Sequence, residues 1–113
     1  MDITIQKIDD MTIVRVVGDI DSSSAPVAQE QILPLAVEGA KILLDMEEVP
    51  YMSSAGLRLL LSMYRQAQRQ NGAVVIARLA EEIKDTMAIT GFITFFTIFE
   101  TIDEASAALN AAT

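Results

Sequence analysis

The sequence contains no cysteine and no histidine among its 113 residues. Without cysteine there are no disulfide bonds or thiolate metal sites, and without histidine the commonest general base and transition-metal ligand is missing. Catalysis by Ser–His or Cys–His pairs is therefore excluded. The sequence also lacks a Walker-type glycine-rich loop and carboxylate pairs at metal-ligand spacing, so we expect a protein that is not an enzyme and holds no cofactor or metal.

Long apolar runs and basic residues are also scarce. No stretch of about 18 uncharged apolar residues occurs, so no membrane span is expected, and residues 1–7 lack the features of a secretory signal. The 16 acidic and 8 basic residues give a formal net charge of −8. This charge disfavours binding to nucleic acid, because neutralising phosphates requires clustered Lys and Arg. We therefore expect a cytoplasmic protein that binds other proteins.

Hydrophobic residues make up 51% of the chain. A chain of this length forms one domain, residues 1–113, and buries roughly two thirds of its unfolded surface. Apolar periodicity predicts strands that alternate with helices. The predicted strands are 3–8, 11–17, 41–46, 73–77 and 93–99, and the predicted helices are 22–39, 54–70, 79–90 and 101–109.

This order of about five strands and four helices predicts an α/β fold. Strands that alternate with helices pair in parallel through right-handed crossovers. The first two strands, joined by the turn residues Asp9 and Asp10, add an antiparallel hairpin at one edge of a mixed, mostly parallel sheet. Pro34 predicts an irregular last turn in the first helix, and Gly39 predicts the end of that helix.

Two features of the predicted strands leave alternatives open. Asp45 is the one charged residue inside the apolar run 42–46. It can brace the loop that follows the strand, or it can lie in solvent at the strand end. The three phenylalanines of segment 93–99 can form an interaction patch, but we interpret them mainly as core residues.

Two adjacent serines, Ser53 and Ser54, stand between an apolar strand and an amphipathic helical pattern. A serine oxygen accepts hydrogen bonds from the free N–H groups of a first helical turn, so both can be ordinary helix caps. The same place also suits a phosphate, because the free N–H groups and the helix dipole favour an anion. The residues alone are compatible with either role.

The segment Tyr51–Arg58, YMSSAGLR, resembles the signature loop of the STAS domain family, the anti-sigma factor antagonists. The family pattern is an apolar residue, Asp or Ser, the phosphoacceptor Ser, a small residue, Gly and Leu. Ser54 matches the phosphoacceptor and Gly56 matches the Gly. Ser53 stands where the family often has Asp, so Ser53 remains an alternative phosphoacceptor.

Two other segments resemble the same family. Gly18–Asp21 is similar to a Gly-x-Leu/Ile-Asp element, which implies that Asp21 lies close to the phosphoacceptor loop. The alternative for Asp21 is a residue that starts the next helix. Thr90–Phe92 is similar to the end of an apolar-x-x-Thr/Ser-Gly-apolar element. These segments are spread over nearly the whole chain, so the resemblance implies the STAS fold.

The resemblance also implies a function, a phosphorylation-controlled protein-binding module in a partner-switching circuit. The unphosphorylated form would bind an anti-sigma factor with serine kinase activity and release that factor's target. Phosphorylation in the Ser54 loop would abolish binding, and a metal-dependent Ser/Thr phosphatase would restore it. The implied partner-binding residues are Asp21, Met52, Ser53, Ser54, Ala55, Gly56, Leu57 and Arg58. The alternative is a constitutive STAS-type structural subunit of a larger complex, in which Ser54 only caps a helix.

The helical pattern after Ser54 places Arg58 one turn further along the chain. At this spacing a guanidinium can approach a phosphate on Ser54, or a carboxylate of a partner when Ser54 is unmodified. A solvated surface arginine is the alternative. On the opposite face we expect four core residues, Leu57, Leu60, Leu61 and Tyr64.

Overall fold

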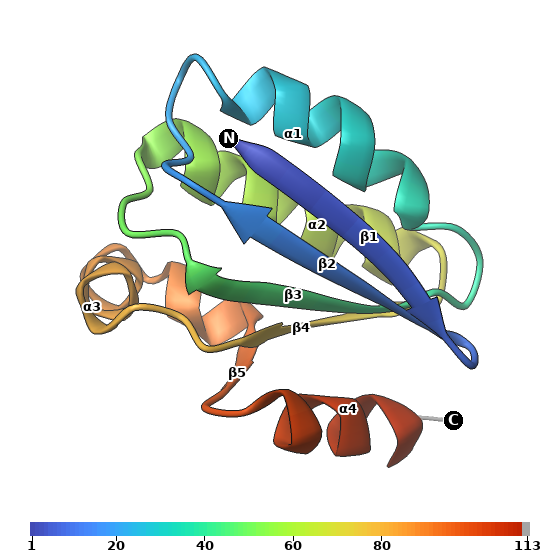
Figure 1. Ribbon diagram of the computed structural model, residues 1–113. Coiled ribbons are helices and arrows are strands. Elements are labelled where there is room, and N and C mark those ends of the chain that lie inside the picture. The colour runs from blue at the N-terminus through green and yellow to red at the C-terminus, as the bar shows by residue number, and fades with distance from the viewer. Residues whose placement is uncertain (112–113) are drawn as a thin grey trace.

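The computed structural model describes residues 1–111 as one sheet with helices on both faces (Figure 1). The strands are β1 (Asp2–Ile8), β2 (Met11–Val17), β3 (Lys41–Glu48), β4 (Ala73–Ala77) and β5 (Thr97–Phe99). The helices are α1 (Ala25–Ile32), α2 (Ser54–Arg69), α3 (Glu81–Thr90) and α4 (Ile102–Ala111). Two short 3₁₀ segments, Leu33–Leu35 and Phe92–Phe95, follow α1 and α3.

The strands lie in the sheet in sequence order, β1-β2-β3-β4-β5. β1 and β2 pair antiparallel, and the other three pairings are parallel. The predicted mixed sheet with an edge hairpin is therefore confirmed. Asp9, at the tip of the hairpin, has a left-handed φ of 56°, which aspartate tolerates better than most residues.

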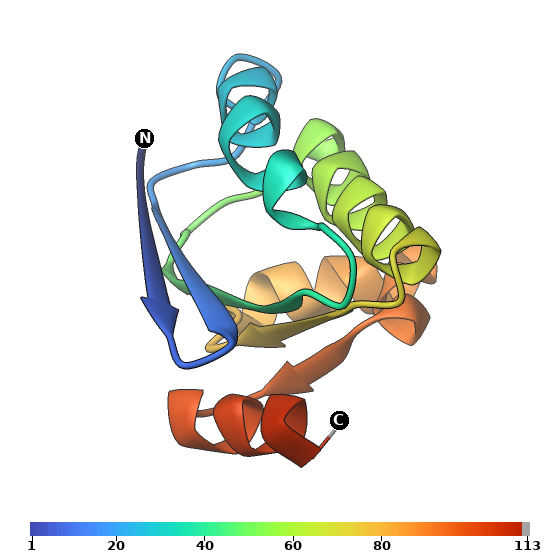
Figure 2. The same cartoon turned by 90° about the vertical axis from the view of Figure 1, so that its right-hand side faces the viewer.

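The helices cover the two faces of the sheet unequally. Figure 2 shows α1 and α2 on one face and α4 on the other. The larger hydrophobic cluster lies under α1, α2 and α3, and a smaller cluster, which includes Leu43 and Leu109, lies under α4. β3 is buried on both faces because both clusters contact it, as expected for a central parallel strand. No helix in residues 1–111 combines the length and apolarity needed to cross a membrane.

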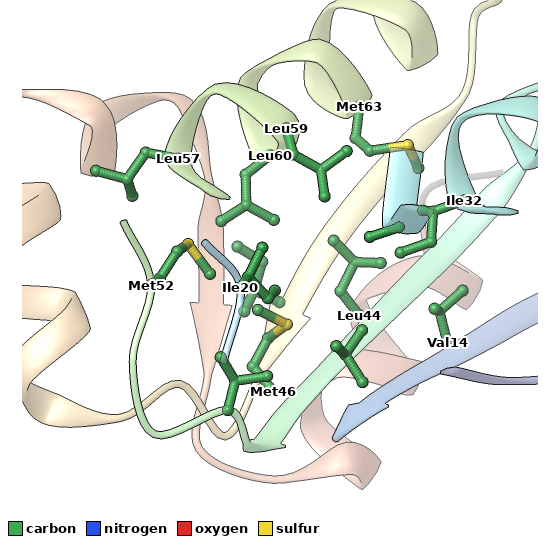
Figure 3. Close-up of a cluster of buried hydrophobic side chains, with 14 of the residues drawn as sticks. Val14, Ile20, Ile32, Leu44, Met46, Met52, Leu57, Leu59, Leu60 and Met63 are labelled. Atoms are coloured by element: carbon green, nitrogen blue, oxygen red, sulfur yellow. The ribbon is translucent and has the colours of Figure 1, made fainter. Parts of the chain in front are cut away.

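The inner face of α2 supplies much of the larger cluster. Leu57, Leu59, Leu60 and Met63, which are labelled in Figure 3, belong to this cluster and are at most 5% exposed. The expected core positions of Leu57 and Leu60 are confirmed. Leu61 is only half-buried and packs against neither hydrophobic cluster, so its expected core position is wrong. At 100° per residue, Leu61 lies on the outer side of α2.

The predicted strand 93–99 is wrong over its first half. Residues Phe92–Phe95 form a 3₁₀ turn after the left-handed Gly91, and β5 begins only at Thr97. The turn packs Phe92 and Phe96 against the larger cluster, whereas Phe95 remains 44% exposed. Tertiary packing therefore prevails over the strand propensity of this aromatic segment, and only part of it is core.

The first helix also ends earlier than expected. α1 stops at Ile32, and Pro34 lies in the 3₁₀ segment that follows, which confirms the irregular last turn. Gly39 does have a left-handed φ of 69°, but it lies beyond the helix, in the turn before β3. The end of α1 is thus determined by proline rather than by glycine.

Asp45 neither braces the following loop nor lies in solvent. It is 4% exposed and forms two hydrogen bonds with Arg78, at 3.1 Å and 2.6 Å. Arg78 also contacts Glu47 at 3.0 Å, so a single guanidinium joins the ends of β3 and β4. The hydrogen bonds that Arg78 donates to Asp45 raise the pKa of Arg78, which stays charged. Both expectations for Asp45 are corrected by this long-range ion pair.

Candidate functional site

The loop that contains the two serines is attached to the segment after β2. The Ile20 N–H donates to the Tyr51 carbonyl at 3.0 Å, and the Ser53 N–H donates to the Ile20 carbonyl at 2.9 Å. Ile20 and Met52 thus form an isolated parallel bridge. This bridge continues the β2–β3 pairing past the ends of both strands and fixes the backbone that leads into α2.

Gly56 lies against the same bridge and is buried. A Cβ atom at this position would overlap the Met52 side chain and lie 3.0 Å from the Ile20 carbonyl oxygen. Only glycine leaves room for α2 to start this close to the loop. The glycine of the signature therefore serves close approach within the protein.

The two serines have different structural roles. Ser53 is the N-cap of α2, and its Oγ accepts a hydrogen bond from the Ala55 N–H at 3.2 Å. Ser54 is the first helical residue and is exposed. Within residues 1–111 its hydroxyl has no hydrogen-bond partner. The expectation that either serine could be the cap is thus resolved, because Ser53 caps the helix and Ser54 leaves its hydroxyl free.

Arg58 lies one turn after Ser54 on the exposed side of α2. It forms no ion pair with any carboxylate in the described part of the chain. Ser54 and Arg58 are spaced four residues apart, so their side chains lie on the same helical face. An anion on Ser54 would have both this guanidinium and the free N–H groups of the first turn within reach.

Asp21 starts the turn that leads into α1 and directly follows Ile20, the residue attached to the loop. One carboxylate oxygen accepts hydrogen bonds from the Ser23 N–H and hydroxyl, at 2.9 Å and 2.7 Å, and from the Ser24 N–H at 3.0 Å. Asp21 therefore caps the turn that precedes α1, whereas the N-cap of the helix itself is Ser24. The Ile20–Met52 bridge also brings its segment alongside the serine loop.

These hydrogen bonds, first of all the one from the Ser23 hydroxyl, lower the pKa of Asp21. We expect Asp21 to titrate below the ordinary aspartate range, and Ser23→Ala to move its pKa back toward that range. Because the folded-state pKa is lowered, the stabilisation exists at neutral pH and is lost as the pH falls through that pKa. Carbon-13 NMR titration of the carboxyl group measures both values. Identical midpoints in the wild type and in Ser23→Ala would contradict this assignment.

The eight residues predicted to bind a partner fall into three groups by exposure. Ser54 and Arg58 are exposed, and Asp21, Ser53 and Ala55 are half-buried. Met52, Gly56 and Leu57 are buried, so their side chains support the loop from below. We therefore restrict the candidate contact surface to the first two groups.

A shallow groove of about 270 Å³ lies between α1 and α2 beside this surface. Pro26 and Gln29 of α1 line one side, and Ala55, Arg58 and Ser62 of α2 line the other. Sequence reasoning missed the α1 side, because only tertiary packing brings the two helices together. Residues 1–111 contain no cluster of three Asp, Glu, His or Cys side chains placed to hold a metal ion.

Comparisons with known proteins agree with this fold. The chain is 35% identical over 78 residues to the anti-sigma-B factor antagonist of Bacillus subtilis, which covers 69% of this chain and 72% of the relative. The fold matches the anti-sigma factor antagonist SpoIIAA in its unphosphorylated form, with a TM-score of 0.80, 17% identity and 97% of each chain covered. The phosphorylated form of the Bacillus SpoIIAA matches with a TM-score of 0.73 at 17% identity, covering 96% of this chain and 99% of that one. The family model for the STAS domain matches residues 2–105, and the chain therefore belongs to the STAS domain family.

Proposed function

We propose that this chain is an anti-sigma factor antagonist that is switched by phosphorylation of Ser54. The observation that carries the proposal is the free, exposed hydroxyl of Ser54 at the start of α2, beside a neighbour that already caps the helix. The names of the relatives support the partner class, and the two solved forms of SpoIIAA show that a protein of this fold exists with and without a phosphate.

In the unmodified state, the exposed serine and the outer face of α2 bind an anti-sigma factor and displace what that factor holds. The anti-sigma factor is also the kinase. The Ser54 oxygen attacks the γ-phosphorus of ATP, the bond to the β–γ bridging oxygen breaks, ADP leaves, and the serine proton passes to a base of the kinase. The reaction takes place where ATP is available, in the cytoplasm.

The phosphate adds a charge of about −1.5 to −2 to the contact surface. In a complex this charge would be desolvated next to a partner shaped for a neutral hydroxyl, which commonly costs several kcal/mol. Binding is lost while the fold is retained, because a helix N-terminus accommodates an anion. A metal-dependent phosphatase hydrolyses the ester and releases inorganic phosphate, which restores the binding form.

Ser54→Ala is expected to abolish phosphate incorporation and to retain binding to the anti-sigma factor, whereas Ser54→Asp weakens that binding by about 100-fold. Intact-mass spectrometry with fragment mapping measures the first result and calorimetry the second. Ser53→Ala is the matched control. It removes the cap, which costs about 1 kcal/mol of stability, but leaves the phosphate on Ser54.

Each alternative outcome would contradict the assignment in a different way. Incorporation that persists in Ser54→Ala and disappears in Ser53→Ala would move the switch to Ser53. A protein that carries no phosphate in its own cells under any growth condition would favour the constitutive structural subunit of a larger complex.

A further inference from the structure

Positive charge is concentrated on one helix of this acidic protein. α2 carries Arg58, Arg65 and Arg69 and has no acidic residue. These three arginines are a large share of the 8 basic residues in a chain of net charge −8. The remaining surface is therefore more acidic than the net charge alone suggests.

Within residues 1–111, the arginines of α2 and Lys7 are the basic residues that form no ion pair. Outside α2, ion pairs with carboxylates occupy Arg15, Lys41, Arg78 and Lys84. Within residues 1–111 no carboxylate pairs with any α2 arginine, and the one side-chain hydrogen bond among them joins Arg69 to Gln66. An unpaired group of like charges on one helical face lowers stability. This arrangement indicates a surface that is complemented by another molecule.

The arginines form a continuous line with the phosphoacceptor candidate. Ser54, Arg58, Leu61, Arg65 and Arg69 are spaced by four, three, four and four residues, which places them on one face of a helix. The line is about 22 Å long at 1.5 Å per residue. Figure 2 shows α1 beside α2 but no element over the outer side of α2. We call these five residues the α2 stripe.

The middle of the α2 stripe is apolar. Leu61 is half-buried, belongs to neither hydrophobic cluster, and lies between Arg58 and Arg65. Arginine is enriched in protein-binding surfaces, and their centre excludes water, so an apolar residue flanked by arginines is compatible with such a surface. A purely electrostatic surface would have no need of this leucine.

We propose that the α2 stripe is the docking surface for an acidic amphipathic helix of the protein partner. This proposal rests on the proposed function, because it concerns the same face of α2. The partner helix presents Asp or Glu on both sides of an apolar residue that packs on Leu61. Its carboxylates pair with Arg58, Arg65 and Arg69 over about four turns.

A protein segment fits the α2 stripe better than nucleic acid does. A duplex would extend its phosphates beyond the three arginines and over surface that holds most of the 16 acidic residues. Asp19 and Asp21 lie before α1, in the segment attached to the serine loop, so negative charge adjoins the N-terminal end of the stripe. A short acidic helix avoids this repulsion because its charges end where the arginines end.

One part of the α2 stripe lies within reach of a phosphate on Ser54, and the other part does not. Arg58 lies about 6 Å along the helix from Ser54, within the range of a phosphate there. Arg65 and Arg69 lie about 16 and 22 Å away, beyond the Debye length of about 8 Å at physiological ionic strength. A phosphate on Ser54 therefore competes with the partner for Arg58, whereas Arg65 and Arg69 lie beyond its direct electrostatic reach.

The test is an NMR titration of the nitrogen-15-labelled full chain with a synthetic helical peptide that presents glutamates around one central leucine. We expect chemical-shift changes at Arg58, Leu61, Arg65 and Arg69, and binding that weakens as salt is raised. Arg65→Glu should reduce the affinity by about tenfold. Lys7→Glu on β1 is the matched control, because Lys7 is exposed, forms no ion pair in the described residues, and undergoes the same charge change.

Several results would overturn the proposal. These are peptide-induced shifts that are absent from α2, an equal loss of affinity in Lys7→Glu, and tighter binding of a short DNA duplex or of phosphatidylserine vesicles than of the peptide. Failure of the proposed function can be distinguished from failure of the docking proposal. If the protein is never phosphorylated on Ser54 but still binds the peptide through α2, the docking surface exists without the phosphorylation switch. In the opposite case, Ser54→Asp loses binding to the anti-sigma factor, but Arg65→Glu does not affect peptide binding. This result would contradict the docking surface and support the phosphorylation switch.

Discussion

Gly56→Val is expected to lower the free energy of unfolding by about 3 kcal/mol or more, because the start of α2 has no room for a side chain. The first added carbon already overlaps Met52 and lies 3.0 Å from the Ile20 carbonyl oxygen. That carbonyl holds the Ser53 N–H at 2.9 Å, so it cannot retreat without releasing the serine loop. Urea denaturation followed by circular dichroism measures the loss.

Three further variants separate crowding from the general cost of losing glycine. Gly39→Ala introduces a side chain at a left-handed φ of 69° with no atom within 4 Å, and we expect a loss of about 1 kcal/mol. Gly56→Ala should cost more than Gly39→Ala. Part of its cost should disappear when Met52→Ala is added, because neighbouring sites that compete for space are not additive. Equal losses at Gly39 and Gly56 would contradict the close approach.

Arg78→Ala is expected to destabilise the protein by about 3 kcal/mol, since it leaves Asp45 buried without its partner. Asp45 is 4% exposed, and its two hydrogen bonds to the guanidinium have lengths of 3.1 Å and 2.6 Å. The planar guanidinium binds both oxygens at once, which lysine cannot do, so Arg78→Lys should recover only part of the loss. Thermal and chemical denaturation at neutral pH test this expectation.

The backbone of Arg78 provides a matched control for the same experiment. Its φ is 59°, a left-handed conformation that costs a residue with a Cβ about 1 kcal/mol relative to glycine. Arg78→Gly removes the same guanidinium as Arg78→Ala but relieves this strain. The glycine variant should therefore be about 1 kcal/mol more stable than the alanine variant. An alanine variant as stable as the wild type would show that Asp45 does not depend on this partner.

The succession of strands and helices along the chain could be predicted from the sequence because it depends on local patterns. The turn residues Asp9 and Asp10, the apolar run of β3 and the amphipathic pattern of α2 each define their element within a short window. The serine loop was located for the same reason, as an abrupt change from apolar strand to helix.

The sequence did not reveal features that depend on residues far apart in the chain. Asp45 and Arg78 are separated by 33 positions, and nothing local identifies one as the partner of the other. The 3₁₀ turn at Phe92–Phe95 has strand-like composition but follows the shape of the core. The distinct roles of Ser53 and Ser54 could not be told apart in the sequence either, because both residue positions suit a helix cap.

The backbone bridge between Ile20 and Met52 has a consequence for how a signal is transmitted. A loop that is joined to the sheet on one side and leads directly into a packed helix on the other has little freedom to change shape. We therefore expect a modification of this protein to change the chemistry of its surface without changing its backbone conformation. Any large conformational change would then occur in the partner that binds this surface.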